Sequence, residues 1–198
     1  MKYRFNKIIK NIKINILKLT HQAKSAHLGS CLSIVEILTV LYFYILKKKD
    51  RFILSKGHSA LALYSVLSEK NIISKKKLFT YGKNDSLLMN HASHKVKGVE
   101  FSTGSLGHGL PVAVGKALKF KLEKKKSKVY VLLSDGELNE GSNWEALLFA
   151  SHHKLNNLVI IIDYNKIQSL GHSKKIINFE PLKDKFISFG CRVAKING

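Results

Sequence analysis

Two oxygen-bearing side chains each follow a short run of apolar residues, about thirty residues apart in the chain. Asp135 comes just after the run 129–133, and Asn165 comes just after the run 158–162. Continuous apolar runs of this kind are typical of parallel strands that are covered on both faces. The carboxyl ends of neighbouring parallel strands meet at one edge of a sheet, so we expect these two side chains to lie there together. A carboxylate oxygen and an amide oxygen at one place can bind a single hard cation.

The segment between these two runs has the length of about one helix, which predicts a strand–helix–strand unit over residues 129–167. Ligands of such sheets bind beyond the carboxyl ends of the strands. Ser33, with Glu36 three residues later, predicts a capping box at the start of a helix that runs to about Leu46. The other expected elements are strands at 51–54 and 191–196, helices at 5–25, 60–67, 74–79, from about Pro111 and at 181–189, and a loop at 167–173.

Histidines occur on three polar loops, two of which lead into an apolar helix. His27 precedes the first of these helices, and His58 stands at the start of the second. Backbone amides at a helix start attract anions, which favours a ligand-binding role for His58. A single loop histidine such as His27 is more often structural. His91 and His94 are three residues apart, but no further ligand completes a zinc site with the usual spacing.

A glycine-rich turn at 101–109 precedes the helix expected from about Pro111. It contains three glycines within six residues, and glycines let the backbone approach a ligand closely. The turn lacks the GxGxxG spacing of dinucleotide-binding loops and the Gly-Lys-Ser/Thr ending of a P-loop. By itself, this turn therefore assigns no ligand.

The composition of the chain is typical of one globular domain with a real core, since 45% of its 198 residues are apolar and the charges are interspersed. The net charge is +21, but only three of the 34 basic residues are arginines. Proteins that read bases depend on arginine for its planar fork, whereas lysine runs at the ends of elements are typical of solvated faces. We therefore expect a weak, salt-sensitive attraction to polyanions and no specific nucleic-acid partner.

The cysteines and the apolar stretches indicate a cytoplasmic protein without a membrane partner. Cys31 and Cys191 are far apart and suggest no disulfide framework, which fits a reducing compartment. The most apolar stretch, 32–46, is interrupted by Glu36 and is too short to span a bilayer. Residues 5–19 predict a lysine-rich amphipathic helix rather than a transit peptide, and no signal-type apolar core is evident.

Six short motifs, taken in order, resemble the diphosphate-binding half of transketolases over roughly residues 20–198. The six are SAHLGS, SKGHS, NHAS, TGSLGHG, SDGELNEGSNWEA and DYNKIQ. The last two resemble the thiamine diphosphate fingerprint, an Asp-Gly pair about thirty residues before an Asn. The resemblance implies an α/β fold of the thiamine diphosphate-binding type, with a doubly wound, mostly parallel sheet flanked by helices. It also implies a single domain over 1–198 that is C-terminally short relative to the family.

The resemblance implies thiamine diphosphate and Mg²⁺ as cofactors, with Ca²⁺ as an alternative ion. Asp135 and Asn165 would ligate the ion through their side chains and Ile167 through its carbonyl oxygen, which are the hard ligands that Mg²⁺ prefers. The implied contacts to the cofactor itself surround its diphosphate and its aminopyrimidine side. They are His58, Gly104, Ser105, Leu106, Asp135, Gly136 and Asn165.

By the same resemblance, His27 and His91 touch the sugar substrate near the reactive carbon of the cofactor. Imidazole transfers protons and forms hydrogen bonds well near neutral pH. Glu140 matches a buried glutamate at the subunit interface that couples two active sites in the family. The implied reaction is that of a transketolase, the transfer of a two-carbon ketol unit from a ketose phosphate to an aldose phosphate in the pentose phosphate pathway.

The family activates the cofactor with a glutamate on a second domain, which this sequence lacks. Split members supply that domain as a separate chain. The resemblance therefore implies that a C-terminal transketolase subunit is an obligate partner, in a heterotetramer that acts on sugar phosphates. Family members also continue past the equivalent of Asn197-Gly198 with a segment that carries another active-site histidine. This leaves three alternatives: a shortened working subunit, a decayed gene product, or a truncated sequence.

Several residues depart from the motifs of the family. Ser134 replaces the first glycine of GDG, and Leu28 and Ala92 replace prolines that follow two of the histidines. The sequence HLGS around Leu28 is similar to that of deoxyxylulose-phosphate synthases. Another thiamine-dependent activity therefore stays an alternative, either deoxyxylulose-phosphate synthesis or that of a 2-oxoacid dehydrogenase component. A further alternative is a decayed, non-catalytic subunit that still binds its partner or holds nucleic acid through its lysines.

Overall fold

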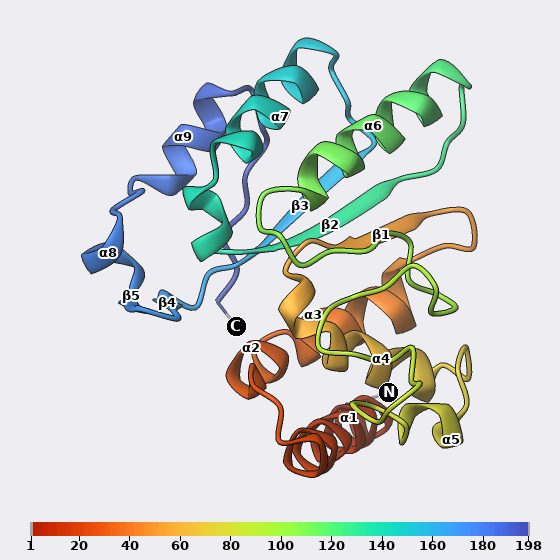
Figure 1. The fold of residues 1–198 in the computed structure, drawn as a ribbon. Coiled ribbons are helices and arrows are strands. Elements are labelled where there is room, and N and C mark those ends of the chain that lie inside the picture. Colours follow the sequence, from red (N-terminus) through yellow and green to blue (C-terminus); the bar gives the residue numbers. More distant parts are fainter. Residues whose placement is uncertain (1, 198) are drawn as a thin grey trace.

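The computed structural model describes residues 2–197, with a three-stranded parallel sheet at the centre of the protein (Figure 1). Its strands, in their order across the sheet, are β1 (Arg51–Leu54), β2 (Val129–Ser134) and β3 (Leu158–Asp163). Ser134 lies opposite Asp163 in the register of β2 and β3. Three of the four predicted strands are confirmed, and the carboxyl ends of these three lie at the same edge of the sheet.

Helices cover both faces of this sheet, which confirms the predicted fold class (Figure 1). The first layer consists of α1 (Lys2–Ala23), α2 (Leu28–Leu32), α3 (Val35–Val40), the π-helix η1 (Leu41–Ile45), α4 (Ala60–Glu69) and α5 (Lys75–Leu78). The second layer consists of α6 (Gly109–Leu122), α7 (Gly141–His152) and α9 (Leu182–Ser188). Each layer packs on its own face of the strands and forms a separate hydrophobic cluster.

Successive side chains of the strands enter these two clusters in alternation. Phe52 and Leu54 of β1 pack with the first layer, whereas Ile53 between them packs with the second. In β2, Tyr130 packs with the first layer and Val131 with the second. Since both faces of the sheet are covered, each strand appears in the sequence as a continuous apolar run rather than an alternating one.

The predicted helices form, with shifts at their ends. In α1, Ile12, Ile16 and Leu19 are fully buried on one face, at the spacing of an amphipathic helix. The short helix α5 begins where it was expected, because the Ser74 hydroxyl oxygen accepts a hydrogen bond from the Lys77 N–H at 3.1 Å.

The capping box predicted from Ser33 and Glu36 is wrong. α3 begins after Ile34, which contributes no side-chain cap. The Ser33 hydroxyl donates instead to Asp163 Oδ2 at 2.6 Å, and Glu36 pairs with Lys13 on the surface at 2.5 Å. A buried carboxylate is a stronger acceptor than a neutral oxygen, so a contact between distant parts of the chain displaced the local capping signal.

The strand predicted at 191–196 is also wrong. These residues follow α9 without forming backbone ladder hydrogen bonds to β3. Cys191 and Val193 still pack partly against the second-layer cluster. Apolar alternation reports that one side of a segment is buried, whereas a strand also needs a neighbouring backbone to pair with.

Short elements follow each strand at its carboxyl end. They are the 3₁₀ turns η2 (Gly57–Ser59) and η3 (Gly136–Asn139), the hairpin of β4 (Ile167–Gln168) and β5 (Gly171–His172), and α8 (Ser173–Ile176). The loop predicted at 167–173 is therefore partly wrong, since it contains this small antiparallel hairpin. Two-residue strands are too short to leave a hydrophobic period in the sequence.

One stretch, Leu28–Ile45, is long and apolar enough by composition to cross a membrane, so the expectation that the apolar stretch at 32–46 is too short to do so was wrong by length alone. It contains Glu36, and it is divided among α2, α3 and η1. Its residues Cys31, Val35 and Leu38 belong to the first-layer cluster. Because the core helix of a globular protein meets the same criteria of length and composition, this stretch gives no argument for a membrane location.

Candidate functional site

The loops that follow the three strands converge at the carboxyl edge of the sheet. The loop after β1 carries Lys56 and His58, the turn after β2 carries Asp135, and β3 ends at Asp163. The N–H of Asp135 donates to the carbonyl oxygen of Asp163 at 3.2 Å, which joins two of these ends directly. Ligands of open parallel sheets bind at this place.

Three of the predicted histidines form a cluster beside this edge. The ring centroid of His27 lies 5.3 Å from that of His58 and 6.1 Å from that of His91. Burial, together with the charge of Lys56 and the neighbouring imidazoles, lowers the pKa of His58 to about 4. Burial and the proximity of His91 also lower the pKa of His27. Both imidazoles are therefore neutral near pH 7, so each has one N–H donor and one nitrogen acceptor.

Local structure holds the backbone of each histidine. His27 precedes α2 with a φ of 71°, a left-handed conformation that is uncommon for a residue with a side chain. His58 lies in η2, immediately before α4. The hydroxyl of Tyr64, which belongs to α4, donates to the carbonyl oxygen of His91 at 2.9 Å. The same helix therefore positions two of the three histidines.

The glycine turn, residues 104–107, lies against this histidine cluster. A Cβ atom on Gly104 would stand 3.1 Å from Cδ2 of His91, so the ring packs directly on the glycine backbone. The hydroxyl of Thr103 donates to the carbonyl oxygen of Leu54 at 2.6 Å and ties the turn to the end of β1. The predicted cofactor-contact residues that this turn brings to the site are Gly104, Ser105 and Leu106.

Asp135 is buried at the end of β2, with 2% of its surface exposed. Its Oδ1 accepts the N–H of Gly136 at 2.8 Å, and its Oδ2 accepts the hydroxyl of Ser173 at 2.6 Å. Within residues 2–197 its carboxylate forms no ion pair. A buried carboxylate is costly without a cationic partner, so a bound cation fits this position. Its oxygens suit a hard ion such as Mg²⁺.

Asn165 and Ile167 lie at the same edge as Asp135, but their oxygens are not gathered at one point. Both residues are exposed, and Oδ1 of Asn165 accepts the N–H of Ile167 at 2.9 Å. The side chain of Gln168 covers Gly136, where a Cβ atom would stand 3.2 Å from it. The residues expected to hold an ion are therefore neighbours at the edge, without the convergent geometry of a filled site.

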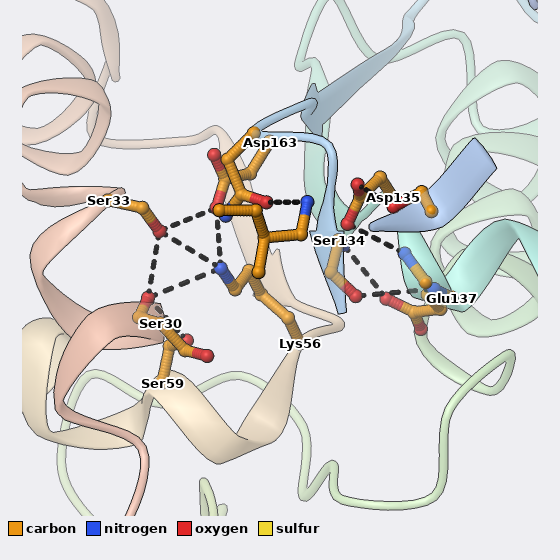
Figure 2. A network of polar contacts seen from close by, with 12 residues as sticks. Ser30, Ser33, Lys56, Ser59, Ser134, Asp135, Glu137 and Asp163 are labelled. Atoms are coloured by element: carbon orange, nitrogen blue, oxygen red, sulfur yellow. Dashed lines mark hydrogen bonds and ion pairs between the residues drawn. The ribbon is translucent and has the colours of Figure 1, made fainter. Parts of the chain in front are cut away.

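A buried ion pair lies near His58, and the sequence did not single it out. Lys56 Nζ is 2.6 Å from Asp163 Oδ2, and the two side chains are 1% and 8% exposed. The same carboxylate oxygen accepts the Ser33 hydroxyl, and Lys56 also donates to the carbonyl oxygen of Ser30 at 3.2 Å (Figure 2). The available signal for Lys56 was a charged residue between two small residues, directly after an apolar run.

Glu137 is a second residue of the site that sequence reasoning missed. It is fully buried in η3, and its carboxylate accepts hydrogen bonds from the Ser55 hydroxyl and the Gly107 N–H. Burial raises the pKa of Glu137, while the donated hydrogen bonds and Lys56 act in the opposite direction. Its position one residue after the Asp-Gly pair was the only signal in the sequence.

Glu140 precedes α7 as its N-cap residue and is exposed in the single chain. It lies next to the glycine turn, since a Cβ atom on Gly107 would stand 2.7 Å from Cβ of Glu140. The burial that the resemblance implies for Glu140 is therefore not provided by this chain, and it stays a prediction about the assembled enzyme.

The fold and the site together define an α/β cofactor-binding domain, in which imidazoles, a glycine turn and a buried carboxylate surround the carboxyl edge of a parallel sheet. Residues 5–198 match the family model described as "Transketolase, thiamine diphosphate binding domain". The chain belongs to the transketolase family and corresponds to its thiamine diphosphate-binding domain.

Several relatives are similar over most of this chain. One of the subunits of the apulose-4-phosphate transketolase of Actinobacillus succinogenes is 47% identical over 196 residues, which cover 94% of this chain and 71% of the relative. Its namesake from Phocaeicola vulgatus is 41% identical, with 92% and 68% covered. "6-deoxy-6-sulfo-D-fructose transketolase subunit SqwG" of a Clostridium species is 38% identical, with 87% and 66% covered. Because all three are named as subunits, each of these enzymes is divided between separate chains.

Solved transketolases have the same fold. The enzyme from Campylobacter jejuni aligns with a TM-score of 0.87 at 29% identity, covering 94% of this chain and 32% of that one. The enzyme from Leishmania mexicana aligns with a TM-score of 0.85 at 27% identity, covering 94% and 31%. The chain therefore spans about a third of the length of these enzymes.

Proposed function

We propose that this chain is the N-terminal, diphosphate-side subunit of a two-subunit transketolase that depends on thiamine diphosphate and Mg²⁺. The observation that carries the proposal is the meeting of His27, His58, His91 and the glycine turn beside the buried Asp135. This arrangement offers the neutral imidazoles of His27 and His58 on one side and a carboxylate that lacks an ion pair within residues 2–197 on the other. The imidazoles suit the proton transfers of sugar chemistry, and the carboxylate suits a cation that holds a diphosphate. The proposed reaction needs these two environments side by side.

We propose that Asp135 and Asn165 hold the Mg²⁺ ion through their side chains and Ile167 through its carbonyl oxygen. The exposed segment 165–168 would then turn its oxygens toward Asp135 when the ion binds. Gly136 would bring the backbone to the diphosphate. His58 stands before α4, where helix amides favour an anion, and as a neutral imidazole it can donate its N–H to a phosphate oxygen.

His27 and His91 are proposed to contact the substrate. When bound, thiamine diphosphate supplies the carbon nucleophile that adds to the ketose carbonyl. Because burial and His91 lower the pKa of His27, its imidazole is neutral and can take a proton from a sugar hydroxyl or hold it by a hydrogen bond. Gly104, Ser105 and Leu106 would line the aminopyrimidine side of the cofactor, and Glu140 would lie at the contact with a second chain.

The partner that we propose is a C-terminal subunit that supplies the pyrimidine-binding half, in a heterotetramer of two subunits of each kind. The relatives that are named as transketolase subunits support a divided enzyme. Their names also suggest that the donor is a ketose phosphate or a related sulfo-sugar rather than one fixed pentose phosphate. We propose that residues 1–198 act as one domain in the cytoplasm, where the free thiols of Cys31 and Cys191 would stay reduced.

Coupled turnover assays test this proposal. The chain is assayed alone and with its second subunit, with thiamine diphosphate, Mg²⁺ and ribose 5-phosphate as acceptor. The donors are xylulose 5-phosphate, apulose 4-phosphate and 6-deoxy-6-sulfofructose, which also resolve the substrate. We expect turnover only when both subunits are present. Robust turnover by the isolated chain would refute the divided enzyme, and turnover of a 2-oxoacid or of pyruvate with glyceraldehyde 3-phosphate would favour another thiamine-dependent activity.

A further inference from the structure

The side chain of Glu137 is fully buried where three segments of the site meet. Its carboxylate accepts a hydrogen bond from the hydroxyl of Ser55, in the loop after β1. It also accepts the N–H of Gly107 at 2.9 Å and the N–H of Ser134, at the end of β2, at 3.4 Å. Figure 2 shows Glu137 beside Ser134 in the polar network of the site. All three partners are donors, so the ionised carboxylate satisfies each of them.

Gly107 is held on both sides by groups that belong to the segment after β2. Its N–H donates to Glu137, and its carbonyl oxygen accepts the hydroxyl of Ser142 at 2.8 Å. Its φ of 83° is a left-handed conformation, and a Cβ atom there would stand 2.5 Å from Oγ of Ser142. The last residue of the glycine turn is therefore fixed in orientation by Glu137 and Ser142.

Glu137 is itself rigidly placed. Its carbonyl oxygen accepts the side-chain N–H of Asn143, a buried residue of α7, at 2.6 Å. It also follows Asp135 by two residues within η3. The carboxylate of Glu137 therefore links the segment that carries Asp135 to the glycine turn.

We propose that Glu137 is a positioning residue that fixes the glycine turn 104–107 relative to Asp135 and thereby sets the fit of the ring end of a bound thiamine diphosphate. The inference rests on the proposed function, because it assigns that cofactor to the site. Glu137 acts through Gly107 and contacts no part of the ligand. Loss of the Glu137 carboxylate should therefore weaken the binding of a ligand that contains the rings much more than the binding of the diphosphate alone.

Calorimetric titrations of the Glu137→Gln variant, in complex with the second subunit, test this inference. Glutamine keeps the size of the side chain but places an NH₂ group where a carboxylate oxygen accepts a hydrogen bond. With Mg²⁺ present, we expect thiamine diphosphate to bind about tenfold or more weakly, because a buried donor loses its acceptor. Binding of inorganic pyrophosphate should change by less than about twofold. The matched control is Glu123→Gln, exposed at the C-terminal end of α6, which should leave both affinities unchanged.

A second variant keeps the test decisive if Glu137→Gln folds poorly. Ser142→Ala removes the hydrogen bond to the other side of Gly107 and leaves Glu137 in place. It should weaken the binding of thiamine diphosphate by about threefold to tenfold, in line with one lost hydrogen bond, and leave the binding of pyrophosphate unchanged. Hydrogen–deuterium exchange of residues 103–109 in the free chain should be faster in both variants than in the Glu123→Gln control.

The outcomes separate this inference from the function on which it rests. Unchanged thiamine diphosphate affinity in both variants would overturn the positioning role. Equal weakening of thiamine diphosphate and pyrophosphate would also overturn it, since Glu137 would then support the whole fold rather than the ring end. If the unsubstituted complex binds neither ligand, the proposed function itself fails.

Discussion

The ammonium group of Lys56 lies 2.6 Å from the carboxylate of Asp163, and both side chains are buried near His58. The pair joins the loop after β1 to the end of β3. Ser33, which lies between α2 and α3, donates a hydrogen bond to the same carboxylate and so joins these helices to the pair. Removing two charges from water is costly, and good geometry with further hydrogen bonds offsets that cost only while both partners are present.

Breaking this ion pair should therefore destabilise the protein strongly, whereas replacing both partners should not. We expect Lys56→Met or Asp163→Leu alone to lower the free energy of unfolding by about 3 to 5 kcal/mol, and the double variant to recover much of this loss. Urea unfolding of the four proteins measures the cycle.

The control for this cycle is the exposed pair of Lys13 and Glu36, whose side chains are 40% and 48% exposed. Lys13→Met should change the free energy of unfolding by less than about 1 kcal/mol. Equal, small effects at Lys56 and Lys13 would contradict the view that Lys56 and Asp163 form a buried, energetically coupled pair.

The pKa of His58 should be near 4 in the free protein, well below the 6.5 of an ordinary histidine, because burial and the charge of Lys56 disfavour its protonated form. NMR titration of the His58 ring protons measures this value directly. A value near 6.5 would contradict the buried environment of His58. The Arg192→Gln variant, remote in sequence and exposed, should leave the titration unchanged.

The same pKa shift predicts a pH dependence of stability. Between about pH 6.5 and pH 4 the unfolded chain binds a proton at His58 and the folded chain does not, so His58 makes folding less favourable as the pH falls through this window. His58→Asn removes this contribution. The free energy of unfolding of the variant, minus that of the unsubstituted protein, should therefore rise as the pH is lowered from 6.5 to 4.

Gly57 is required by close packing rather than by backbone freedom. A Cβ atom at this position would stand 2.4 Å from the backbone of Thr103, where no flexible side chain can yield. Gly57→Ala should lower the free energy of unfolding by about 1 to 3 kcal/mol or more, as overpacking does. Gly115→Ala, in α6 with open space around it, should instead raise it by about 0.5 to 1 kcal/mol. Thermal unfolding compares the two, and similar results for both would contradict the close approach at Gly57.

His27 occupies a left-handed backbone conformation that costs stability, which is expected of a residue retained for its chemistry. His27→Gly should relieve this strain and leave the free energy of unfolding equal or raised by about 1 kcal/mol. The same variant should lose turnover in the two-subunit assay. A variant that is destabilised and remains active would show that His27 has a structural role.

The sheet and the place of Asp135 could be predicted because they depend on local patterns. Continuous apolar runs identify strands that are covered on both faces, and the register then brings Ser134 opposite Asp163. The histidine cluster could not be predicted from spacing. His27 and His91 are far apart in the sequence, and only the packing of their loops on α2 and α4 brings the rings within 6.1 Å. The resemblance to transketolases supplied that grouping.

The residues that sequence reasoning missed all act over long distances in the chain. Ser33 and Asp163 are 130 residues apart, and Lys56 and Asp163 are 107 apart. A capping signal at Ser33 is visible locally, but its competitor at Asp163 is not. The two-residue strands of the hairpin at 167–172 were also missed, since their pairing depends on the turn at Ser169 and Leu170 rather than on any hydrophobic period.

The central claim is that Asp135 anchors a metal-held diphosphate at the carboxyl edge of the sheet, and calorimetric titration of the two-subunit complex with thiamine diphosphate tests it most directly. The unsubstituted complex should bind one cofactor per chain in the presence of Mg²⁺ and lose this binding in EDTA. Asp135→Ala should abolish the Mg²⁺-dependent binding, while Asp184→Ala, exposed on α9, should leave it intact. Cofactor binding that persists unchanged in Asp135→Ala, or that ignores EDTA, would contradict the account.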